Sequence, residues 1–579
     1  MDIKIVQISS MEKVRANDDL NYREVNRKSV LAGERVSYQI CTSSASALFA
    51  SVSVESDIAK CVQLYQVREI YMDAPVTKDV PVEDYITKEP GFMPDLLVPM
   101  NDLLMEDINK QSSASEMDVT DKKHYQVTFS KKVNSIWVRV DVPKDIKPGV
   151  YSIKVGITMM QHGGEIIGVI YKNMMLDVIP ALMPEQKLIY TRWFYADCVA
   201  VAHNVKIFSE EHWELIEKYI ARAADMGVNM ILVPIHTPPL DTEIGTTRPC
   251  VQLVDIEKDG EHYKFSFSKF KRFIGICKRN GIKYFEMAHM FSQWGAKYAA
   301  NILVSENGRK QYLFGWNVAS DSEEYIYFLK QYIQAIAEEL EKEGISEQTY
   351  FHISDEPSSF SVDAYKKAHE IIRPLIGKSK TFDALSDYVF FEKGLVECPI
   401  TFVEHIHEFL GHDISEQWVY YCSTPQQVFT NSFIAMPSYR TRILGYLLYK
   451  YKIKGFLHWG FNFYFSEQSL YSINPYLTTS GDRAFPSGDP FIVYPEKDKV
   501  YPSIRGEITY EAIQDMNICF ALEAHIGRDK VVSMIDATAG YDLRFDHYPR
   551  NKEFLENLRA QMVREIKKNV EERENSYGK

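Results

Sequence analysis

Hydrophobic and polar residues alternate along much of the first third of the chain. Four segments have the character of β-strands, at 35–40, 136–142, 150–160 and 166–179. Turn signals at Pro148-Gly149 and Gly163-Gly164 precede the last two. The stretch 75–99 contains five prolines and is expected to be a long ordered loop. Several short strands separated by turns predict a two-sheet β-sandwich over residues 1–180.

Beyond residue 184, short apolar runs alternate with amphipathic segments, which is the pattern of βα units. Eight strands are expected, at 188–195, 229–235, 283–288, 350–354, 380–384, 400–404, 418–421 and 455–459. Helical periodicity lies between several of them, at 210–226, 323–343, 363–372 and 438–449. Eight units in roughly 280 residues have the size of a (β/α)8 barrel. The sequence therefore predicts an α/β TIM barrel over residues 185–465.

A doubly wound parallel sheet is the competing fold. It normally places a glycine-rich phosphate turn after its first strand, whereas residues 191–197 contain no glycine. Residues 466–579 begin with a loop-rich stretch and continue with helical periodicity at 510–523 and 551–571. We expect them to form a C-terminal loop and helical region that packs on the barrel.

The net charge and the cysteine content of the chain limit the kinds of molecule it is expected to bind and the compartment in which it is expected to act. The chain has 579 residues and a net charge of −13, from 66 Lys or Arg against 79 Asp or Glu. Nucleic acid is not an expected partner, because its binding needs a basic face. Eight cysteines without a Cys-x-x-Cys pair indicate reduced thiols. With no signal-peptide pattern and no apolar run near 18 residues, we expect a soluble cytoplasmic protein without a membrane span.

The most informative residues follow the fourth predicted strand, because catalytic groups of a barrel gather at the C-terminal ends of its strands. This strand ends in Asp355 and Glu356, and Pro357 comes next. Two adjacent carboxylates raise each other's proton affinity, so one can remain protonated as a general acid while the other is ionised. A helix N-cap is the alternative use of such a pair. The apolar strand that leads directly into it favours catalysis.

The other strand ends supply candidate sugar contacts. We expect them to converge with the carboxylate pair at one barrel face, namely Tyr195, His236, His289, Asp383, His405, Tyr420, Trp459 and Asn462. Most barrel glycosidases place a second carboxylate across the sugar, and the seventh strand ends in tyrosines instead. Glu404 and Asp383 remain candidates for that nucleophile. A substrate that carries its own nucleophile is the alternative explanation.

Three histidines at 405, 407 and 412 raise the question of a metal. His407 and His412 are five residues apart, whereas the helical zinc motif needs a spacing of four. We therefore expect no metal ligands, and with no phosphate-binding glycine loop we expect no cofactor.

Several motifs resemble glycoside hydrolase family 123, the β-N-acetylgalactosaminidases. The sequence His-Ile-Ser-Asp-Glu-Pro at 352–357 resembles the family's catalytic strand-4 motif. Similar stretches occur in the barrel and the C-terminal region, at 237–242, 289–295, 456–464 and 503–505. The resemblance implies substrate-assisted retaining hydrolysis, in which Asp355 orients the 2-acetamido group and Glu356 is the acid and base. It implies a glycan with terminal β-linked N-acetylgalactosamine, on an oligosaccharide or glycolipid, as the partner.

Two other functions stay open at this point. One is a two-carboxylate glycosidase with Glu356 as acid and Glu404 or Asp383 as nucleophile. The other is a glycan-binding protein without catalytic activity.

Overall fold

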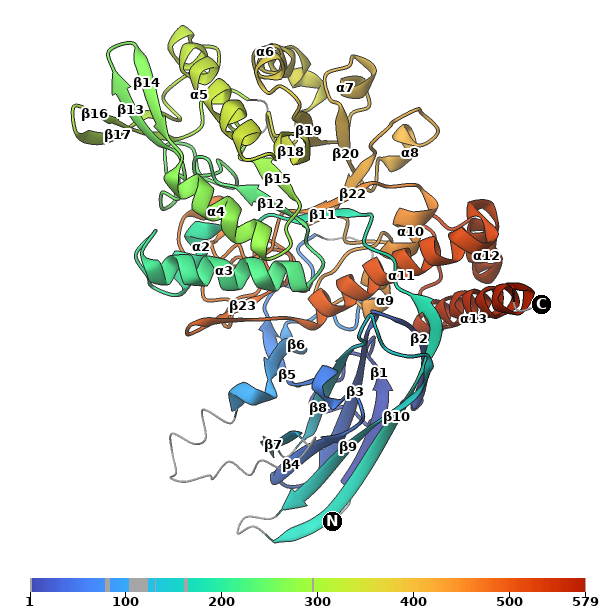
Figure 1. Ribbon diagram of the computed structural model, residues 1–579. Coiled ribbons are helices and arrows are strands. Elements are labelled where there is room, and N and C mark those ends of the chain that lie inside the picture. Colours follow the sequence, from blue (N-terminus) through green and yellow to red (C-terminus); the bar gives the residue numbers. More distant parts are fainter. Residues whose placement is uncertain are drawn as a thin grey trace.

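A β-sandwich and a closed barrel make up most of the molecule, and long C-terminal helices lie alongside both (Figure 1). The computed structural model describes residues 3–78, 84–103, 123–130, 132–160, 165–293 and 296–577. The predicted turn at Gly163-Gly164 lies outside these residues. The fold class expected from the sequence is confirmed.

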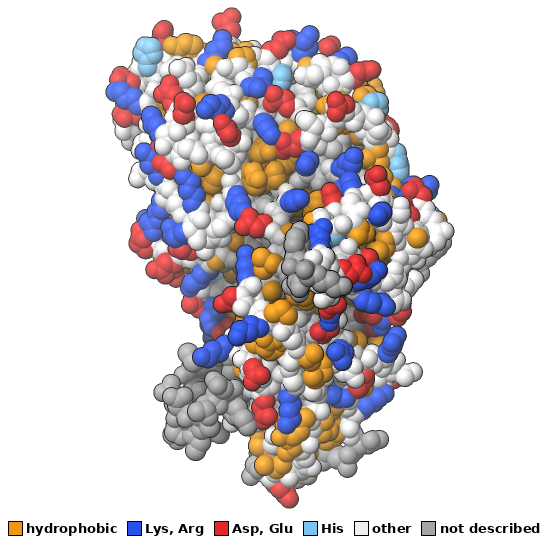
Figure 2. All heavy atoms as spheres, turned by 45° about the vertical axis from the view of Figure 1, so that its right-hand side comes forward, with side chains coloured by type: hydrophobic (Ala, Val, Ile, Leu, Met, Phe, Trp, Pro, Cys, Tyr) orange, Lys and Arg blue, Asp and Glu red, His pale blue; other side chains and the backbone are white. Residues whose placement is uncertain are grey.

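Two five-stranded sheets form the sandwich. One has the order β1 (Ile3–Ser9), β3 (Arg35–Ser44), β8 (Val133–Asp141), β5 (Val62–Met72) and β6 (Gly91–Pro99). The other has the order β2 (Arg27–Ala32), β10 (Ile166–Leu182), β9 (Gly149–Met160), β4 (Leu48–Glu55) and β7 (Lys123–Phe129). Alternate residues of β4 are buried between the sheets, as the period of two requires. Hydrophobic side chains also gather at the lower, outer end of the sandwich (Figure 2).

The proline-rich stretch 75–99 is not a loop throughout, which corrects the expectation from its composition. Its last nine residues form β6, the edge strand that pairs with β5. Pro94 lies where the register shifts between Arg68 and Glu69. Proline is tolerated at a sheet edge and at a bulge because its missing N–H costs no ladder hydrogen bond there. Residues 79–83 of this stretch are outside the described part of the chain.

All eight predicted barrel strands are present, and a closed ring replaces the doubly wound alternative. In ring order they are β11 (Ile189–Arg192), β12 (Met230–Val233), β15 (Tyr284–Met287), β18 (Thr349–Phe351), β19 (Lys380–Leu385), β20 (Cys398–Phe402), β21 (Trp418–Tyr420) and β22 (Gly455–His458). Each runs parallel to its neighbours. All residues of β12, β18, β20, β21 and β22 are buried, which explains why they read as short continuous apolar runs.

Helices surround this ring (Figure 1). Their bounds are α2 (Ala196–Ala202), α3 (Glu210–Asp225), α4 (Ser268–Arg279), α5 (Glu323–Lys342), α6 (Val362–Ile372), α7 (Val389–Glu392), α8 (Ile406–Phe409), α9 (Ser438–Arg442) and α10 (Leu444–Lys450). Ser209 and Ser322 cap the two longest of them through their hydroxyl groups. No described helix is long and apolar enough to span a membrane.

The loops after β12 and β15 carry a small sheet that the sequence pattern did not predict. Its order is β14 (His262–Ser266), β13 (Asp255–Asp259), β16 (Ile302–Glu306) and β17 (Arg309–Phe314). These loops enlarge the barrel rim at the strand ends from which the catalytic groups are expected.

Helix α11 (Ile504–Ile526) is largely buried because it passes between the barrel helices and the sandwich (Figure 1). Gly445 of α10 allows the close crossing, since a Cβ there would lie 1.9 Å from the carbonyl oxygen of Ala512. Helices α12 (Arg528–Ala539) and α13 (Lys552–Tyr577) follow, and α13 packs against β2 and β10 of the sandwich.

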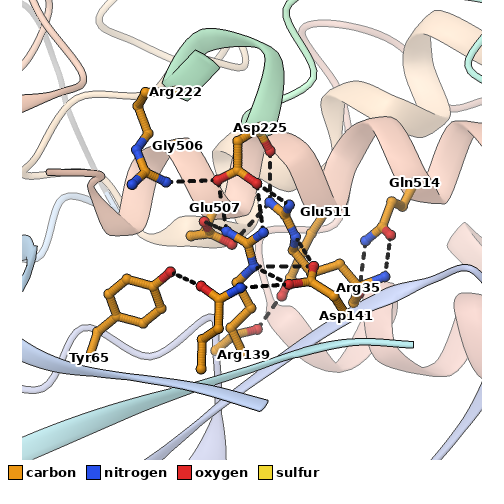
Figure 3. Close-up of polar contacts among 12 residues, drawn as sticks. Arg35, Tyr65, Arg139, Asp141, Arg222, Asp225, Gly506, Glu507, Glu511 and Gln514 are labelled. Carbon is orange, nitrogen blue, oxygen red and sulfur yellow. Dashed lines mark hydrogen bonds and ion pairs between the residues drawn. The ribbon is translucent and has the colours of Figure 1, made fainter. Parts of the chain in front are cut away.

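A charged network joins the three parts of the molecule (Figure 3). Asp225, at the end of α3, accepts hydrogen bonds from Arg35 at 2.7 Å and Arg139 at 2.6 Å, both from the sandwich. Glu507 of α11 lies 3.3 Å from Arg139. Although burial opposes it, Arg139 and Arg35 lower the pKa of Asp225. The barrel is thereby held to the sandwich through charges that are largely removed from water.

We expect Asp225→Asn to destabilise the protein by about 3 kcal/mol, because two largely buried arginines lose a carboxylate partner. Urea unfolding followed by tryptophan fluorescence measures this loss as a lower midpoint. Asp259→Asn, which breaks only the exposed pair with Lys264, is the matched control and should leave the midpoint unchanged. Equal midpoints for all three proteins would show that the network carries no stability.

Candidate active site

The carboxylate pair lies at the C-terminal end of β18. Asp355 is 7 % exposed, whereas Glu356 is exposed to solvent. The backbone of Glu356 is left-handed, with φ of 44°, a conformation that costs a residue with a Cβ free energy and concentrates at functional sites. The turn therefore points the two adjacent carboxylates into different environments.

Each carboxylate has its own hydrogen-bond donor. Gln293 donates from Nε2 to Asp355 Oδ2 at 3.2 Å, and the hydroxyl of Tyr420 donates to Glu356 Oε1 at 2.8 Å. Gln293 is itself oriented, because its Oε1 accepts the backbone N–H of Asp241 at 2.6 Å. Gln293 thus connects the loops after β12 and β15 to the carboxylate at the end of β18.

The burial of Asp355 beside Glu356 changes its pKa. Burial, and next the charge of Glu356, raise the pKa of Asp355 to about 7. Burial also raises the pKa of Asp241 to about 6. At neutral pH Asp355 is therefore poised between its two protonation states in the unliganded site, as expected for a group that takes part in proton or charge transfer.

A buried ionic cluster lies beneath the pair, inside the barrel. His352, three residues before Asp355, contacts Glu286 Oε2 through Nε2 at 2.9 Å and Asp383 Oδ1 through Nδ1 at 3.1 Å. Burial opposes protonation of His352, but Asp383 and Glu286 raise its pKa to about 9. Glu286 also accepts hydrogen bonds from Thr191 and Trp193. The cluster joins strands β11, β15, β18 and β19.

Part of this cluster has residue types that can bind a metal ion. His289, His352 and Asp383 place possible ligand atoms within 4.8 Å of one another. Both ring nitrogens of His352 are engaged by carboxylates, and a protonated imidazole has no lone pair for a metal. The donor set fits an ion-paired histidine better than a metal centre.

The three histidines considered for a metal in the sequence lie in different surroundings. His405 pairs with Glu408 at 3.5 Å, His407 lies 3.9 Å from Asp546, and the ring of His412 packs on Tyr388. They do not form a ligand set with one another.

Three of the predicted sugar contacts are buried in the barrel and hydrogen-bonded within the protein. Asp383 is fully buried, and it accepts hydrogen bonds from Tyr365 at 2.6 Å, from His352 and from the backbone of Ile353. Asn462 is also fully buried, and its amide exchanges two hydrogen bonds with the backbone of Tyr195, at 2.9 and 3.0 Å. Tyr195 itself is only 2 % exposed. A buried amide must satisfy its polar groups, and the backbone of Tyr195 does this for Asn462.

Trp459, directly after β22, is held by contacts within the protein. Its indole N–H donates to Asp489 at 3.0 Å, and its half-buried ring packs on Phe463 and Phe485. Burial, followed by Glu356 and Asp489, raises the pKa of Cys422 to about 12. The charges of Glu356 and Asp489 therefore both act on this thiol.

Two predicted histidines are buried beside the ionic cluster. The ring of His289 stacks on His352 with centroids 4.0 Å apart, and burial lowers its pKa well below the usual range. Neither of its nitrogens has a hydrogen-bond partner among the described residues. His236 contacts the carbonyl of His289 through Nε2 at 2.9 Å, and burial lowers its pKa to about 4. Both rings are neutral.

Gln293 and Asp241 are the site residues that strand-end reasoning missed. Gln293 lies six residues beyond the end of β15 and Asp241 eight residues beyond the end of β12, both within long loops. The motifs at 237–242 and 289–295 contain them and were the available signal. Trp294 and Gly295 of the second motif lie outside the described residues.

A (β/α)8 barrel with a carboxylate pair at its fourth strand is an arrangement of glycoside hydrolases. The model of the glycoside hydrolase 123 catalytic domain matches residues 193–522, and the chain belongs to this family. It is a glycoside hydrolase.

One solved structure shares the fold over the whole chain. A family 123 glycoside hydrolase from Clostridium perfringens, described for glycolipid glycan hydrolysis, has a TM-score of 0.71 and 16 % identity over 100 % of this chain and 99 % of that one. A family 2 member from Bacteroides cellulosilyticus has a TM-score of 0.26 and 9 % identity over 74 % of this chain and 44 % of that one. No curated protein matches the chain.

The raised pKa of Asp355 predicts how the stability of the protein depends on pH. Its folded-state pKa of about 7 exceeds the ordinary 3.8, so ionising it costs folding free energy, and the cost grows as pH rises between those values. Asp355→Asn removes the cost. We expect this variant to melt about 2 °C or more above the parent at pH 8, with a smaller gain at pH 5.

Differential scanning calorimetry at both pH values makes this comparison. Asp413→Asn, at an exposed carboxylate, is the control and should show the same small difference at each pH. A gain for Asp355→Asn that is larger at pH 5 than at pH 8 would contradict the assigned sign.

Proposed function

We propose that the protein is a retaining hydrolase that releases β-linked N-acetylgalactosamine, with the substrate's 2-acetamido group as the nucleophile. The observation that carries the proposal is the pairing of a buried Asp355 with an exposed Glu356, opposite a seventh strand whose end supplies the hydroxyl of Tyr420. An enzyme nucleophile would normally occupy that strand end in a retaining barrel.

In the first step, the ionised Asp355 accepts the acetamido N–H and strengthens the nucleophilicity of the amide oxygen. That oxygen attacks C1 while Glu356 donates its proton to the glycosidic oxygen, so the C1–O bond breaks as the ring of the oxazolinium intermediate forms. The intermediate keeps its N–H proton, and the ionised Asp355 balances its positive charge. In the second step, Glu356 takes a proton from water, the water oxygen bonds to C1, and the amide reforms. Two displacements at C1 retain its configuration.

The two other candidate nucleophiles fit less well. Asp383 is committed to His352 and Tyr365 inside the barrel. Glu404 is exposed two residues beyond the end of β20. Neither makes a hydrogen bond with Asp355 or Glu356 among the described residues.

Unpaired buried atoms support a sugar-binding role for the surrounding wall. His289 offers two ring nitrogens without partners, and Asp241 has an unpaired buried Oδ2. Such atoms cost free energy unless a ligand or water satisfies them, and hydroxyl groups of a terminal sugar can do so. A glycan of an oligosaccharide or glycolipid as substrate is supported by the family and by the Clostridium perfringens enzyme, which is described for glycolipid glycan hydrolysis. Terminal N-acetylgalactosamine as its sugar rests on the resemblance of the motifs.

A comparison of three aryl β-glycosides tests the proposal. Their sugars are N-acetylgalactosamine, N-acetylglucosamine and galactose. We expect turnover of the N-acetylgalactosaminide, retained β-configuration in the first product by NMR, and inhibition by a thiazoline analogue of the intermediate. Equal turnover of the galactoside, or an inverted product, would show that the nucleophile is an enzyme carboxylate or a directly activated water. No turnover of any substrate would favour a glycan-binding role.

The roles of the two carboxylates can be distinguished by changing the leaving group of the substrate. Glu356→Gln should lose about 10²–10⁴-fold in kcat with a poor leaving group and much less with an activated nitrophenyl glycoside, which needs little protonation. Asp355→Asn should slow both substrates. Steady-state kinetics with the two aglycones measures this, and Glu404→Gln serves as the matched control with near-parental rates. A large loss in Glu404→Gln would instead support the two-carboxylate mechanism.

A further inference from the structure

The side chain of Gln293 lies between the carboxylate pair and the loop after β12. Gln293 is half-buried in the loop after β15, and its amide contacts one partner with each of its two polar atoms. Its Oε1 accepts the backbone N–H of Asp241 at 2.6 Å, and its Nε2 donates to Asp355 Oδ2 at 3.2 Å. The first contact fixes which way the amide points, because only its oxygen can accept. The N–H group of the amide is therefore directed at the carboxylate of Asp355.

Asp241 is itself held by the loop that follows β22. Its Oδ1 accepts the backbone N–H of Gln468 at 3.1 Å, and its carbonyl oxygen accepts the hydroxyl of Ser469 at 2.6 Å. The backbones of Asp241, Gln468 and Ser469 are all left-handed, with φ of 42°, 54° and 54°. Such conformations cost residues with a Cβ free energy and concentrate at functional sites. We name this contact between the two loops the loop clasp, and it fixes the N–H group that orients Gln293.

The contact with Gln293 engages one of the two oxygens of Asp355. No other described residue donates a hydrogen bond to this carboxylate, so Oδ1 is left to accept from a ligand. In the proposed mechanism Asp355 must be ionised and must accept the N–H of the 2-acetamido group. A donor on Oδ2 favours the ionised carboxylate and determines which oxygen is presented to the sugar.

We propose that Gln293 is the positioning residue of Asp355, which it holds ionised and oriented toward the 2-acetamido group. This inference rests on the proposed function. The side chain must be an amide, because it accepts a hydrogen bond from Asp241 and donates one to Asp355, whereas a carboxylate could only accept. The loop clasp thereby acts on catalysis from the loop after β22, through Asp241 and Gln293.

Charged groups also act on the ionisation of Asp355, but Gln293 can be changed without changing the charge of the site. Burial, and next Glu356, raise the pKa of Asp355, whereas the hydrogen bond from Gln293 lowers it. A further carboxylate, that of Asp241, lies beyond Gln293. The titratable groups that interact with Asp355 come from several strand ends, namely His352 and Glu356 at β18, Asp383 on β19, Tyr195 after β11 and Tyr420 on β21.

The test is the pH dependence of kcat/KM for an aryl N-acetylgalactosaminide, whose acid limb reports the ionisation of Asp355. Gln293→Met keeps the size of the side chain but has no donor, and Gln293→Glu adds a negative charge in its place. We expect the acid limb to move to higher pH by about 0.5–1 pH unit in Gln293→Met and by more in Gln293→Glu. On the plateau, kcat should fall about 10-fold with good and poor leaving groups alike, because Gln293 acts on the acetamido group and not on the departing oxygen.

Gln252→Met is the matched control. Gln252 is buried in the loop after β12, where it donates to the carbonyls of Val254 and Leu303, each at 2.8 Å, and contacts neither carboxylate. Its loss should lower the melting temperature and leave the acid limb where it is in the parent protein. An unchanged acid limb in both Gln293 variants, or an equal shift in Gln252→Met, would overturn the proposal.

A second measurement needs no turnover and so separates this proposal from the proposed function. Gln293→Met is made in the parent protein and in Asp355→Asn, and the four proteins are melted at pH 8 by differential scanning calorimetry. We expect Gln293→Met to lower the melting temperature about twice as much or more in the parent, because a hydrogen bond to an ionised carboxylate is stronger than one to an amide. This result would support the contact even if no glycoside were hydrolysed. Equal lowering in the two backgrounds would overturn the role of Gln293 even in an active hydrolase.

Discussion

The charged imidazole of His352, held between Glu286 and Asp383, is the contact on which the position of the active site depends. Strand β18 is only three residues long and has few ladder hydrogen bonds of its own. The ionic cluster compensates for the few backbone hydrogen bonds of β18, because it joins this strand to the strands on both sides through side chains in the barrel interior. A buried ion pair with complete hydrogen bonding is strongly directional, and removal of one member leaves a buried charge. The turn that follows β18 is thereby fixed.

That turn converts two chemically similar carboxylates into two different groups. The left-handed backbone of Glu356 separates the directions of the side chains, so that one enters the protein and meets Gln293 while the other faces solvent and meets Tyr420. Their proximity keeps the proton affinities of the pair linked. A division of roles between adjacent residues needs this geometry, since on an extended strand they would point to opposite faces of the sheet.

Sequence patterns gave the barrel because buried parallel strands are continuous apolar runs of four to eight residues. They did not give β6, because proline content predicts a loop and cannot reveal a strand at a sheet edge. The carboxylate pair of the candidate site could be predicted from its place after an apolar strand, and Tyr420 from the end of another. Gln293 and Asp241 lie deep in loops without periodicity, so only the two motifs that contain them could have pointed to them. The hydrogen bonds of Asn462 could not be predicted either, because the backbone of Tyr195, which accepts from and donates to its amide, is more than 260 residues away in the sequence.

The ion pair between Arg505 and Asp95 bears on how far the catalytic region can be treated as a module. Arg505 begins α11 and is fully buried, and its guanidinium lies 2.9 Å from Asp95 on β6 of the sandwich. The region that defines the family, residues 193–522, contains the arginine, whereas its counter-ion comes from almost a hundred residues before that region starts. A barrel transplanted onto another scaffold would carry an uncompensated cation into its core. The sandwich is therefore part of the catalytic region's interior, and a chimaeric enzyme must inherit both or supply a new carboxylate.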